Sequence, residues 1–326
     1  MIIHEFARHA RVAAIAASLC AIAPAHAQSF PTKPIRVIGI ATAGSPSDVI
    51  GRAAAEVLAR QIGAQIVVEN RAGAGGTIAA GAVVRSEADG HTLLLTSSAQ
   101  SGMPWLYSNL GYDPIRDFAG VATLAELPNL LVVPPQRGWE SIKDMIAAAK
   151  SKPGALNFGS GGTGSGTHMS SEKLMLAAGI TATHVPFKGT AEGLVEVAAG
   201  RLDWFFSPAA AAVSLAKDGR LKALAVSSKR RMTLLPDLPT TTEAGVPDAE
   251  YQFWVGLLAP RKTPRGAVAK LNVELQKALS SVELRERYRL LGAETLLMKP
   301  EEFDAFLLAD SEATGRIVKA AGIKTQ

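Results

Sequence analysis

The chain has 326 residues, a formal net charge of +5 and a single cysteine, and 48% of its residues are hydrophobic. This length exceeds the usual size of one hydrophobic core and predicts two lobes. The positive excess is small and scattered. Its most basic run, residues 229–231, lacks the interleaved aromatic side chains of a single-strand binder, so nucleic acid is not expected as a partner.

Residues 1–27 have the pattern of an export signal. Arg8 and Arg11 precede an apolar run over residues 12–23, and Ala25-His26-Ala27 matches an A-x-A cleavage pattern. The apolar run of about 12 residues is too short for a hydrocarbon core, which needs roughly 20. We therefore expect cleavage after Ala27 rather than a membrane anchor.

The only cysteine, Cys20, lies within this segment, so the mature chain is predicted to have none. Disulfides, thiol nucleophiles and thiolate metal sites are then excluded. An exported chain without disulfides suits a bacterial periplasm. We expect no metal and no cofactor.

The first half alternates apolar runs of strand type with stretches of helical periodicity, which predicts a parallel sheet with helices on its faces. Strands are expected at residues 35–40, 64–69 and 92–96, and helices at 47–61 and 77–84. Residues 104–117 read as irregular. Residues 119–133 read as extended and end at Pro134-Pro135, where the chain is expected to leave the first lobe.

A second alternating series follows, and it predicts a second α/β lobe. Its strands are expected at 156–158, 183–186, 202–206 and 221–227, and its helices at 141–150, 167–178, 190–199 and 209–218. An extended run at 251–259 is read as a return crossing, followed by helices at 264–280, 282–291 and 300–321. Domain 1 then spans residues 28–128 and 250–326, and domain 2 spans residues 129–249.

Open parallel sheets bind ligands beyond the carboxyl ends of their strands, so three loops are expected to face one cleft. They are residues 41–48, 96–102 and 159–168. The last, Gly159-Ser160-Gly161-Gly162-Thr163-Gly164-Ser165-Gly166-Thr167-His168, joins a strand to a helix. Glycines let the backbone approach a ligand, and the N-terminus of the helix favours an anion. A flexible linker is the alternative for a Gly/Ser run.

Several ordered motifs closely resemble the Bug family of extracytoplasmic solute receptors, the TctC-like binding components of tripartite tricarboxylate transporters. They are the segments at residues 30–36, 68–76, 112–114, 184–189, 238–240 and 243–245. The resemblance implies two Rossmann-like lobes joined by crossing strands, as in a type II-like periplasmic binding protein. It also implies a small carboxylate ligand held in the cleft, and transporter membrane subunits as partners; a sensor protein is the alternative partner.

The sequence departs from the family pattern in ways that bear on the ligand. The first loop lacks the usual aromatic residue, and Ser207 stands where many relatives have an aspartate that faces a ligand amine. Amino-acid ligands are therefore disfavoured. Trp204, Phe205 and Phe206 could line a pocket for an aromatic ligand, although strand aromatics belong more often to the core.

The candidate ligand-binding residues carry hydroxyls, flexible backbone or positive charge in the three loops and the neighbouring strand ends. They are Ala43, Gly44, Ser45, Ser47, Ser97, Ser98, Ser160, Gly161, Thr163, Gly164, Ser165, Thr167, His168, Lys188 and Ser207. One of Ser97 and Ser98 can serve as a helix cap instead. Asp48 is expected to cap a helix or fix a water rather than touch an anion. Lys188 and His168 can also be ordinary solvated residues.

An enzyme would need a nucleophile, a base and a group that orients the base. The sequence has no G-x-S-x-G or H-E-x-x-H motif. Residues 159–164 match G-x-G-x-x-G, but no acidic residue follows at the distance needed to hold a ribose. We therefore predict a monomeric, non-enzymatic receptor that closes about a small organic carboxylate. The alternative is an exported serine hydrolase with Ser97 or Ser165 as nucleophile and His168 as base.

Overall fold

Two β-sheets organise residues 30–325, which are the residues that the computed structural model describes. One sheet has six strands in the order β11-β4-β10-β3-β1-β2, and the other has five in the order β7-β6-β8-β5-β9. All of these elements fall within residues 33–326, which form one compact unit. The predicted export signal at residues 1–27 lies outside the described residues.

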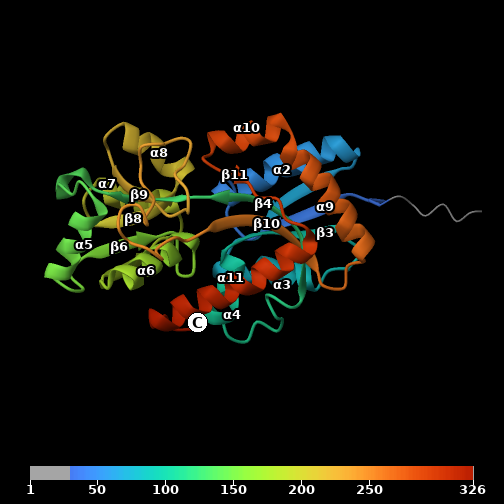
Figure 1. The fold of residues 1–326 in the computed structure, drawn as a ribbon. Coiled ribbons are helices and arrows are strands. Elements are labelled where there is room, and N and C mark those ends of the chain that lie inside the picture. Colours follow the sequence, from blue (N-terminus) through green and yellow to red (C-terminus); the bar gives the residue numbers. More distant parts are fainter. Residues whose placement is uncertain (1–29, 326) are drawn as a thin grey trace, which may run out of the picture. The chain divides into compact units, whose positions relative to one another are not determined.

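In the six-stranded sheet, β1 pairs parallel with β2 and β3, and β10 lies antiparallel between β3 and β4. The strands are β1 (Ile35–Gly39), β2 (Ile66–Asn70), β3 (Thr92–Ser97), β4 (Phe118–Leu127), β10 (Phe253–Pro260) and β11 (Glu294–Thr295). The helices are α2 (Pro46–Ile62), α3 (Thr77–Val84), α4 (Ala99–Leu106), α9 (Arg265–Ser280), α10 (Val282–Leu290) and α11 (Pro300–Ala320). Helix α2 packs against α9 and α10, and α4 packs against α11 (Figure 1).

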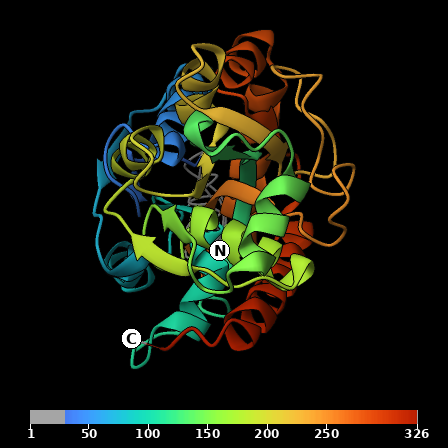
Figure 2. The same cartoon turned by 90° about the vertical axis from the view of Figure 1, so that its left-hand side faces the viewer.

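In the five-stranded sheet, β6 pairs parallel with β7 and β8, whereas β5 runs antiparallel to β8 and β9. The strands are β5 (Asn129–Val133), β6 (Asn157–Ser160), β7 (Thr183–Pro186), β8 (Trp204–Pro208) and β9 (Lys222–Val226). The helices are α5 (Ile142–Ser151), α6 (Gly166–Ala178), α7 (Thr190–Ala198) and α8 (Ala209–Lys217). Figure 2 turns these green-to-yellow elements toward the reader. Two short 3₁₀ turns, η1 (Ala74–Gly76) and η2 (Pro135–Arg137), complete the regular elements of residues 30–325.

The chain passes between the sheets twice. It leaves the six-stranded sheet at Pro128, between β4 and β5, and returns along residues 227–252, between β9 and β10. The two crossings are bonded to each other: Asn129 N donates to Ser227 Oγ at 3.0 Å, and Ser227 N donates to Asn129 O at 2.8 Å. Ser227 Oγ in turn donates to Tyr251 O at 3.1 Å.

The aromatic run in β8 belongs to the core. Trp204 and Phe206 pack with Leu131 on one face of the sheet, and Phe205 packs with Leu130 on the other. This alternation is the period of two expected of a strand buried on both faces. All three aromatic side chains are fully buried. The structure therefore favours the core alternative over a pocket wall.

Most predicted elements are confirmed to within two residues, and two differences have clear physical causes. The extended run at residues 119–133 is two strands in different sheets, because Pro128 has no N–H to continue a ladder. Helix α4 forms where the sequence reads as loop and irregular chain around Pro104. Tertiary bonds support it: Gln100 Nε2 donates to Pro114 O at 2.7 Å, and Thr96 Oγ1 donates to Gln100 Oε1 at 3.1 Å.

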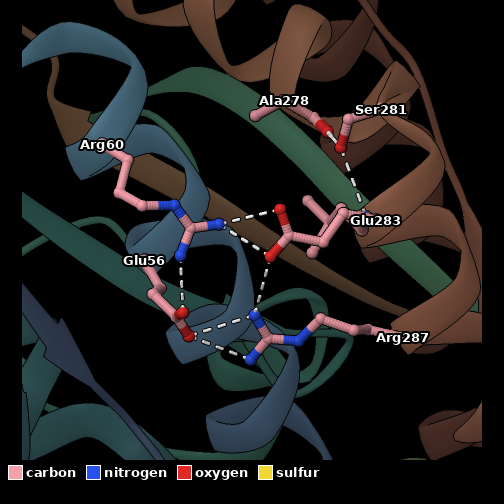
Figure 3. Close-up of polar contacts among 7 residues, drawn as sticks. Glu56, Arg60, Ala278, Ser281, Glu283 and Arg287 are labelled. Carbon is pink, nitrogen blue, oxygen red and sulfur yellow. Dashed lines mark hydrogen bonds and ion pairs between the residues drawn. The ribbon is translucent and has the colours of Figure 1, made fainter.

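A ring of four charged side chains joins α2 to α10 (Figure 3). Arg60 bonds Glu56 at 2.6 Å and Glu283 at 2.7 Å, and Arg287 bonds Glu56 at 3.0 Å. All four side chains are exposed or half-exposed.

No helix among residues 30–325 is both long and apolar enough to cross a membrane.

Candidate ligand-binding site

The candidate residues gather at the carboxyl ends of parallel strands in each sheet. Residues 41–48 follow β1, and Ser97 and Ser98 end β3. Residues 161–165 join β6 to α6, Lys188 lies between β7 and α7, and Ser207 lies near the end of β8. Within each sheet these strands run parallel, so their loops share one edge, as the sequence predicts.

In the first loop, Asp48 is occupied by its own neighbours. Its carboxylate accepts bonds from Gly44 N at 2.8 Å, Arg52 Nε at 2.9 Å and Asn70 Nδ2 at 2.8 Å. Burial disfavours the ionised form of Asp48, but these donors outweigh it and hold the pKa below its usual value. Ser45 caps α2 by accepting from Asp48 N at 3.4 Å. Asp48 thus shapes the loop with its charge already balanced by Arg52.

The two serines at the end of β3 have different environments. Ser97 Oγ accepts from Ala99 N at 3.4 Å, at the start of α4. Ser98 N donates to Trp254 O at 3.1 Å, whereas the buried Ser98 hydroxyl has no hydrogen-bond partner among residues 30–325. Ser97 therefore accepts from a backbone N–H at the start of α4, whereas the buried Ser98 hydroxyl lies near that of Tyr251 without a hydrogen bond of ordinary geometry.

Side chains of the glycine-rich loop, residues 159–168, occupy several of its own amides. Gly161 N donates to Thr167 Oγ1 at 2.8 Å, Gly162 N to Ser160 Oγ at 3.1 Å and Gly164 N to His168 Nδ1 at 3.1 Å. Ser165 N donates to Gly162 O at 3.1 Å. A loop built this way is held in one shape rather than behaving as a flexible linker.

Other amides of the same loop keep no intramolecular partner. Within residues 30–325, no hydrogen bond is made by the N–H groups of Thr163, Gly166 and Thr167. Gly166 and Thr167 begin α6, and Ser165 caps that helix by accepting from His168 N at 3.3 Å. The N–H groups of a first helical turn have no intrahelical acceptor and attract negative charge. Fewer backbone N–H groups of this loop are thus available to bind a ligand than its glycine content suggests.

The starts of α4 and α6 lie against each other. A Cβ placed on Gly166 would lie 3.2 Å from Ser98 Oγ and 2.4 Å from Phe253 Cδ2, and one on Gly164 would lie 2.3 Å from Leu106 Cδ1. The structure therefore brings Ser98 together with residues 164–167. Sequence reasoning missed the N–H of Gln100 at the start of α4, because it did not predict that helix; this N–H also lacks a partner within the described chain.

The remaining candidates lie apart from this junction. Among residues 30–325, no hydrogen bond or ion pair joins the first loop to the glycine-rich loop. Lys188 is exposed, and its backbone N–H donates to Glu192 Oε2 at 3.4 Å. Ser207 is fully buried, and its hydroxyl donates to the carbonyl of Pro208 at 3.1 Å.

Two stacked imidazoles lie behind the glycine-rich loop. The rings of His168 and His184 have centroids 3.9 Å apart, and His184 continues the stack onto Phe158. His184 Nε2 lies 2.6 Å from Ser160 Oγ. Burial, and to a lesser extent the neighbouring His168, lowers the pKa of His184 to about 3, so this imidazole is neutral at physiological pH.

The geometry does not assemble the hydrolase alternative. The His168 ring is 2% exposed and is occupied by Gly164 N on one nitrogen and Glu172 on the other, at 3.2 Å. Ser165 Oγ accepts from the backbone N–H of His168 and does not bond its ring. Among residues 30–325, no group of three or more potential ligands is placed to hold a metal ion.

Neither of two well-formed cavities contains a candidate residue. One, of about 440 Å³, lies beside the two crossings and is lined by Pro128, Lys173, Tyr251 and Asp310 among others. The second lies between α8 and residues 234–238. The candidate site is therefore the junction of α4 and α6 rather than an enclosed hollow.

The fold consists of two β-sheets with flanking helices, linked by two crossings, with polar loops at the strand ends. This architecture is that of the periplasmic solute-binding proteins. Residues 50–323 match the model of the tripartite tricarboxylate transporter family receptor, TctC, and the chain belongs to this family. The protein is accordingly a periplasmic receptor rather than an enzyme, and nothing in the comparisons supports a serine hydrolase.

Individual relatives agree with this assignment. The chain is 31% identical over 305 residues to the protein BugT of Bordetella pertussis, covering 93% of each chain. A protein of R. palustris solved with adipate is 32% identical with a TM-score of 0.83, covering 91% of this chain and 100% of that one. MatC of Rhodopseudomonas palustris with bound malate is 32% identical with a TM-score of 0.78, covering 89% and 100%. The predicted Bug-family, TctC-like receptor is thus confirmed.

Proposed function

We propose that this receptor binds a small organic mono- or dicarboxylate where the N-termini of α4 and α6 meet. The observation that carries the proposal is a set of unpartnered donors at one junction. They are the N–H groups of Gln100, Gly166 and Thr167 together with the hydroxyl of Ser98. Aligned N–H groups at helix N-termini bind carboxylates without a cationic side chain.

The electrostatics of the neighbouring loops agree with an anionic ligand. Arg52 balances the charge of Asp48 and Asn70 donates a hydrogen bond to it, which reduces its repulsion of an anion. Ser207 is fully buried, donates to the carbonyl of Pro208 and supplies no charge. Adipate in one solved relative and malate in another are dicarboxylates of the proposed size. An aromatic carboxylate remains compatible with the chemistry, but the aromatic residues of β8 give it no wall.

Some candidate residues support the loop rather than touch the ligand in this proposal. Ser160 is fully buried between His184 and Gly162, and His168 is enclosed by Glu172 and Gly164. Both fix the shape of the glycine-rich loop. Thr163, partly exposed and with an unpartnered N–H, is left as a direct contact, and Ser45, Ser47 and Lys188 would complete the site on closure.

Closure of two domains on the ligand would be the output of binding. We assign domain 1 to residues 28–128 and 250–326 and domain 2 to residues 129–249, with hinges at 128–134 and 250–258. A ligand that contacts both domains shifts the population toward the closed state. The membrane subunits of a tripartite tricarboxylate transporter, or a sensor protein, would then recognise the closed state. In this proposal the receptor is a monomer, and its export signal is cleaved after Ala27.

The test is calorimetric titration and thermal unfolding of the purified protein from Gln28 onward with adipate, malate and aromatic carboxylates. The neutral ester dimethyl adipate serves as the matched control. A bound carboxylate at 100 times its Kd stabilises the fold by about 2.7 kcal/mol, and the ester should give no shift. If no carboxylate stabilises the protein, or the ester does so equally, the proposal is wrong.

Two neighbouring serines localise the site. Ser98→Ala removes a hydroxyl without an internal partner, so we expect about 10-fold weaker carboxylate binding and an unchanged melting temperature. Ser97→Ala removes the cap of Ala99 N, so the melting temperature should fall with little change in affinity. Thr163→Ala should also weaken binding. Reversed results for Ser97 and Ser98 would move the ligand away from the junction.

A further inference from the structure

The cavity of about 440 Å³ beside the two crossings, here called the hinge cavity, has no role in the proposed function. Both crossings line it, the outgoing one through Pro128 and the returning one through Tyr251. Helix α6 contributes Lys173, and α11 contributes Asp310 and Ile317. Elements that carry both sheets therefore meet in its wall.

The hinge cavity contains two charged groups that lack an ion-pair partner. Within residues 30–325, no carboxylate lies within 4.0 Å of Lys173 Nζ, which donates only to the carbonyl of Glu250. No cation lies within that distance of Asp310, whose Oδ2 accepts from Ser101 Oγ at 2.5 Å and Trp254 Nε1 at 2.8 Å. Burial lowers the pKa of Lys173 and raises that of Asp310, although the carboxylates of Glu250, Asp248 and Asp310 favour the charged lysine and Lys173 favours the charged Asp310.

An unpartnered hydroxyl completes the polar part of the hinge cavity. Tyr251 is 5% exposed, and its hydroxyl lies near Ser98 and Thr314 without forming a hydrogen bond of ordinary geometry. Buried polar groups are nearly always satisfied, so an orphaned hydroxyl in a cavity wall indicates a place for a ligand group. Leu127 and Ile317 supply apolar wall beside it.

We propose that the hinge cavity is a second ligand site, which binds a small zwitterion with an apolar body, such as an aliphatic amino acid. The ligand carboxylate would pair with Lys173, and its ammonium group would pair with Asp310. Basic and acidic side chains line the cavity in equal number, so neither a simple anion nor a simple amine is favoured by the surroundings. A zwitterion compensates both partly buried charges at once.

The probe is L-leucine, with two matched analogues that each lack one charge: 4-methylpentanoate without the amine, and isoamylamine without the carboxylate. Binding to the purified protein is measured by calorimetry, with and without saturating adipate. We expect leucine to bind under both conditions, and each analogue to bind the hinge cavity at least 10-fold more weakly. Leucine binding that disappears with adipate would overturn the proposal.

Variants assign the binding to the hinge cavity. Lys173→Met keeps the aliphatic stem, and Asp310→Asn keeps an acceptor for Ser101 and Trp254; each should weaken leucine binding at least 10-fold. Glu312→Gln, an exposed charge change on the same helix as Asp310, is the matched control and should not alter it. Ser98→Ala should weaken carboxylates only.

Three further outcomes contradict the proposal: no leucine binding to the wild-type protein, full binding by both cavity variants, or equal loss in the control. Because leucine and the two cavity variants play no part in the carboxylate test, failure of either proposal leaves the other standing.

Discussion

The imidazole rings of His168 and His184 lie stacked face to face, with centroids 3.9 Å apart. Gly164 N donates to His168 Nδ1, so that nitrogen carries no proton and Nε2–H faces Glu172. His184 in turn lies against Ser160, at the start of the glycine-rich loop. The two stacked rings therefore support the backbone that positions the donors of α6.

This arrangement predicts a particular loss of stability in acid. The pKa of His184 is lowered to about 3 in the folded protein, against about 6.5 when unfolded. Between these values the unfolded chain binds more protons, so stability falls as the pH decreases from about 6.5 toward 3. Replacing the histidine should reduce this slope.

The measurement is urea unfolding from pH 7 to pH 4 for the wild-type protein and His184→Gln. We expect a shallower acid dependence in the variant. Parallel slopes in the wild-type protein and His184→Gln would show that His184 is not the titrating group.

The contact of Gly164 with Leu106 predicts a second, larger effect. Gly164 has a φ of +79°, and a Cβ there would lie 2.3 Å from Leu106 Cδ1. Leu106 is buried with Met169 and Tyr251 and has little room to move. Gly164→Ala should therefore destabilise the folded protein in two ways. Holding an alanine in the left-handed backbone conformation should cost about 1–2 kcal/mol, and the clash of its Cβ with Leu106 about 1–3 kcal/mol.

The two terms can be separated experimentally. Gly154 has a φ of +76° with nothing within 4 Å of a new Cβ, so Gly154→Ala reports the backbone term alone. Combining Gly164→Ala with Leu106→Ala should cost less than the sum of the single changes, because the clash is removed. Denaturant unfolding gives all four values; equal losses at Gly154 and Gly164 would mean that Gly164 and Leu106, the last residue of α4, are not in firm contact.

The fold was largely predictable because hydrophobic periodicity is a local property. The βα units around β1, β2 and β6 follow from alternating apolar patterns that residues 35–70 and 156–178 carry themselves. The break of residues 119–133 into two strands at Pro128 was not predictable from the pattern, since both flanking runs are apolar and extended, although the domain division is predicted after the same residue. Only the pairing of β4 with β10 and of β5 with β8 assigns them to different sheets.

The candidate site was predictable in position but not in its donor set. The sequence identifies the glycine-rich loop, but not that Thr167 and His168, in the first turn of α6, reach back to accept from the backbone N–H groups of Gly161 and Gly164. Helix α4 depends on the distant carbonyl of Pro114, so its N-terminal donors had no local signal. Which amides remain for a ligand is a tertiary property.

Asp48 provides a third prediction, on how the first loop is held. Its buried carboxylate joins Gly44, Arg52 and Asn70, which belong to three separate parts of the chain. Asp48→Ala would leave a backbone N–H and two side chains without their acceptor, and we expect a loss of about 2–4 kcal/mol. Asp48→Asn keeps one acceptor and should cost less.

Urea unfolding at pH 7 measures these losses, with the exposed capping carboxylate of Asp144 replaced by alanine as the control. The control should destabilise less than Asp48→Ala. Because the pKa of Asp48 is lowered, its contribution is present above pH 3.8 and disappears as the pH falls through the folded-state value. A loss in Asp48→Ala no greater than in the control would show that the loop holds its shape without this carboxylate.

The ring of Glu56, Arg60, Glu283 and Arg287 makes the opposite prediction, of a small and salt-dependent effect. Its side chains are 39–53% exposed, so water and ions screen every pair. Arg287→Gln removes the bonds to Glu56 and Glu283 and should lower the melting temperature at low salt by no more than roughly 2 °C. At 1 M NaCl, where the screening length is about 3 Å, the difference should vanish.

Arg316→Gln on α11, an exposed arginine outside the ring, should show no salt-dependent difference from the wild-type protein. A drop for Arg287→Gln that persists at 1 M NaCl would mean that packing of its aliphatic stem, rather than charge, joins α10 to α2.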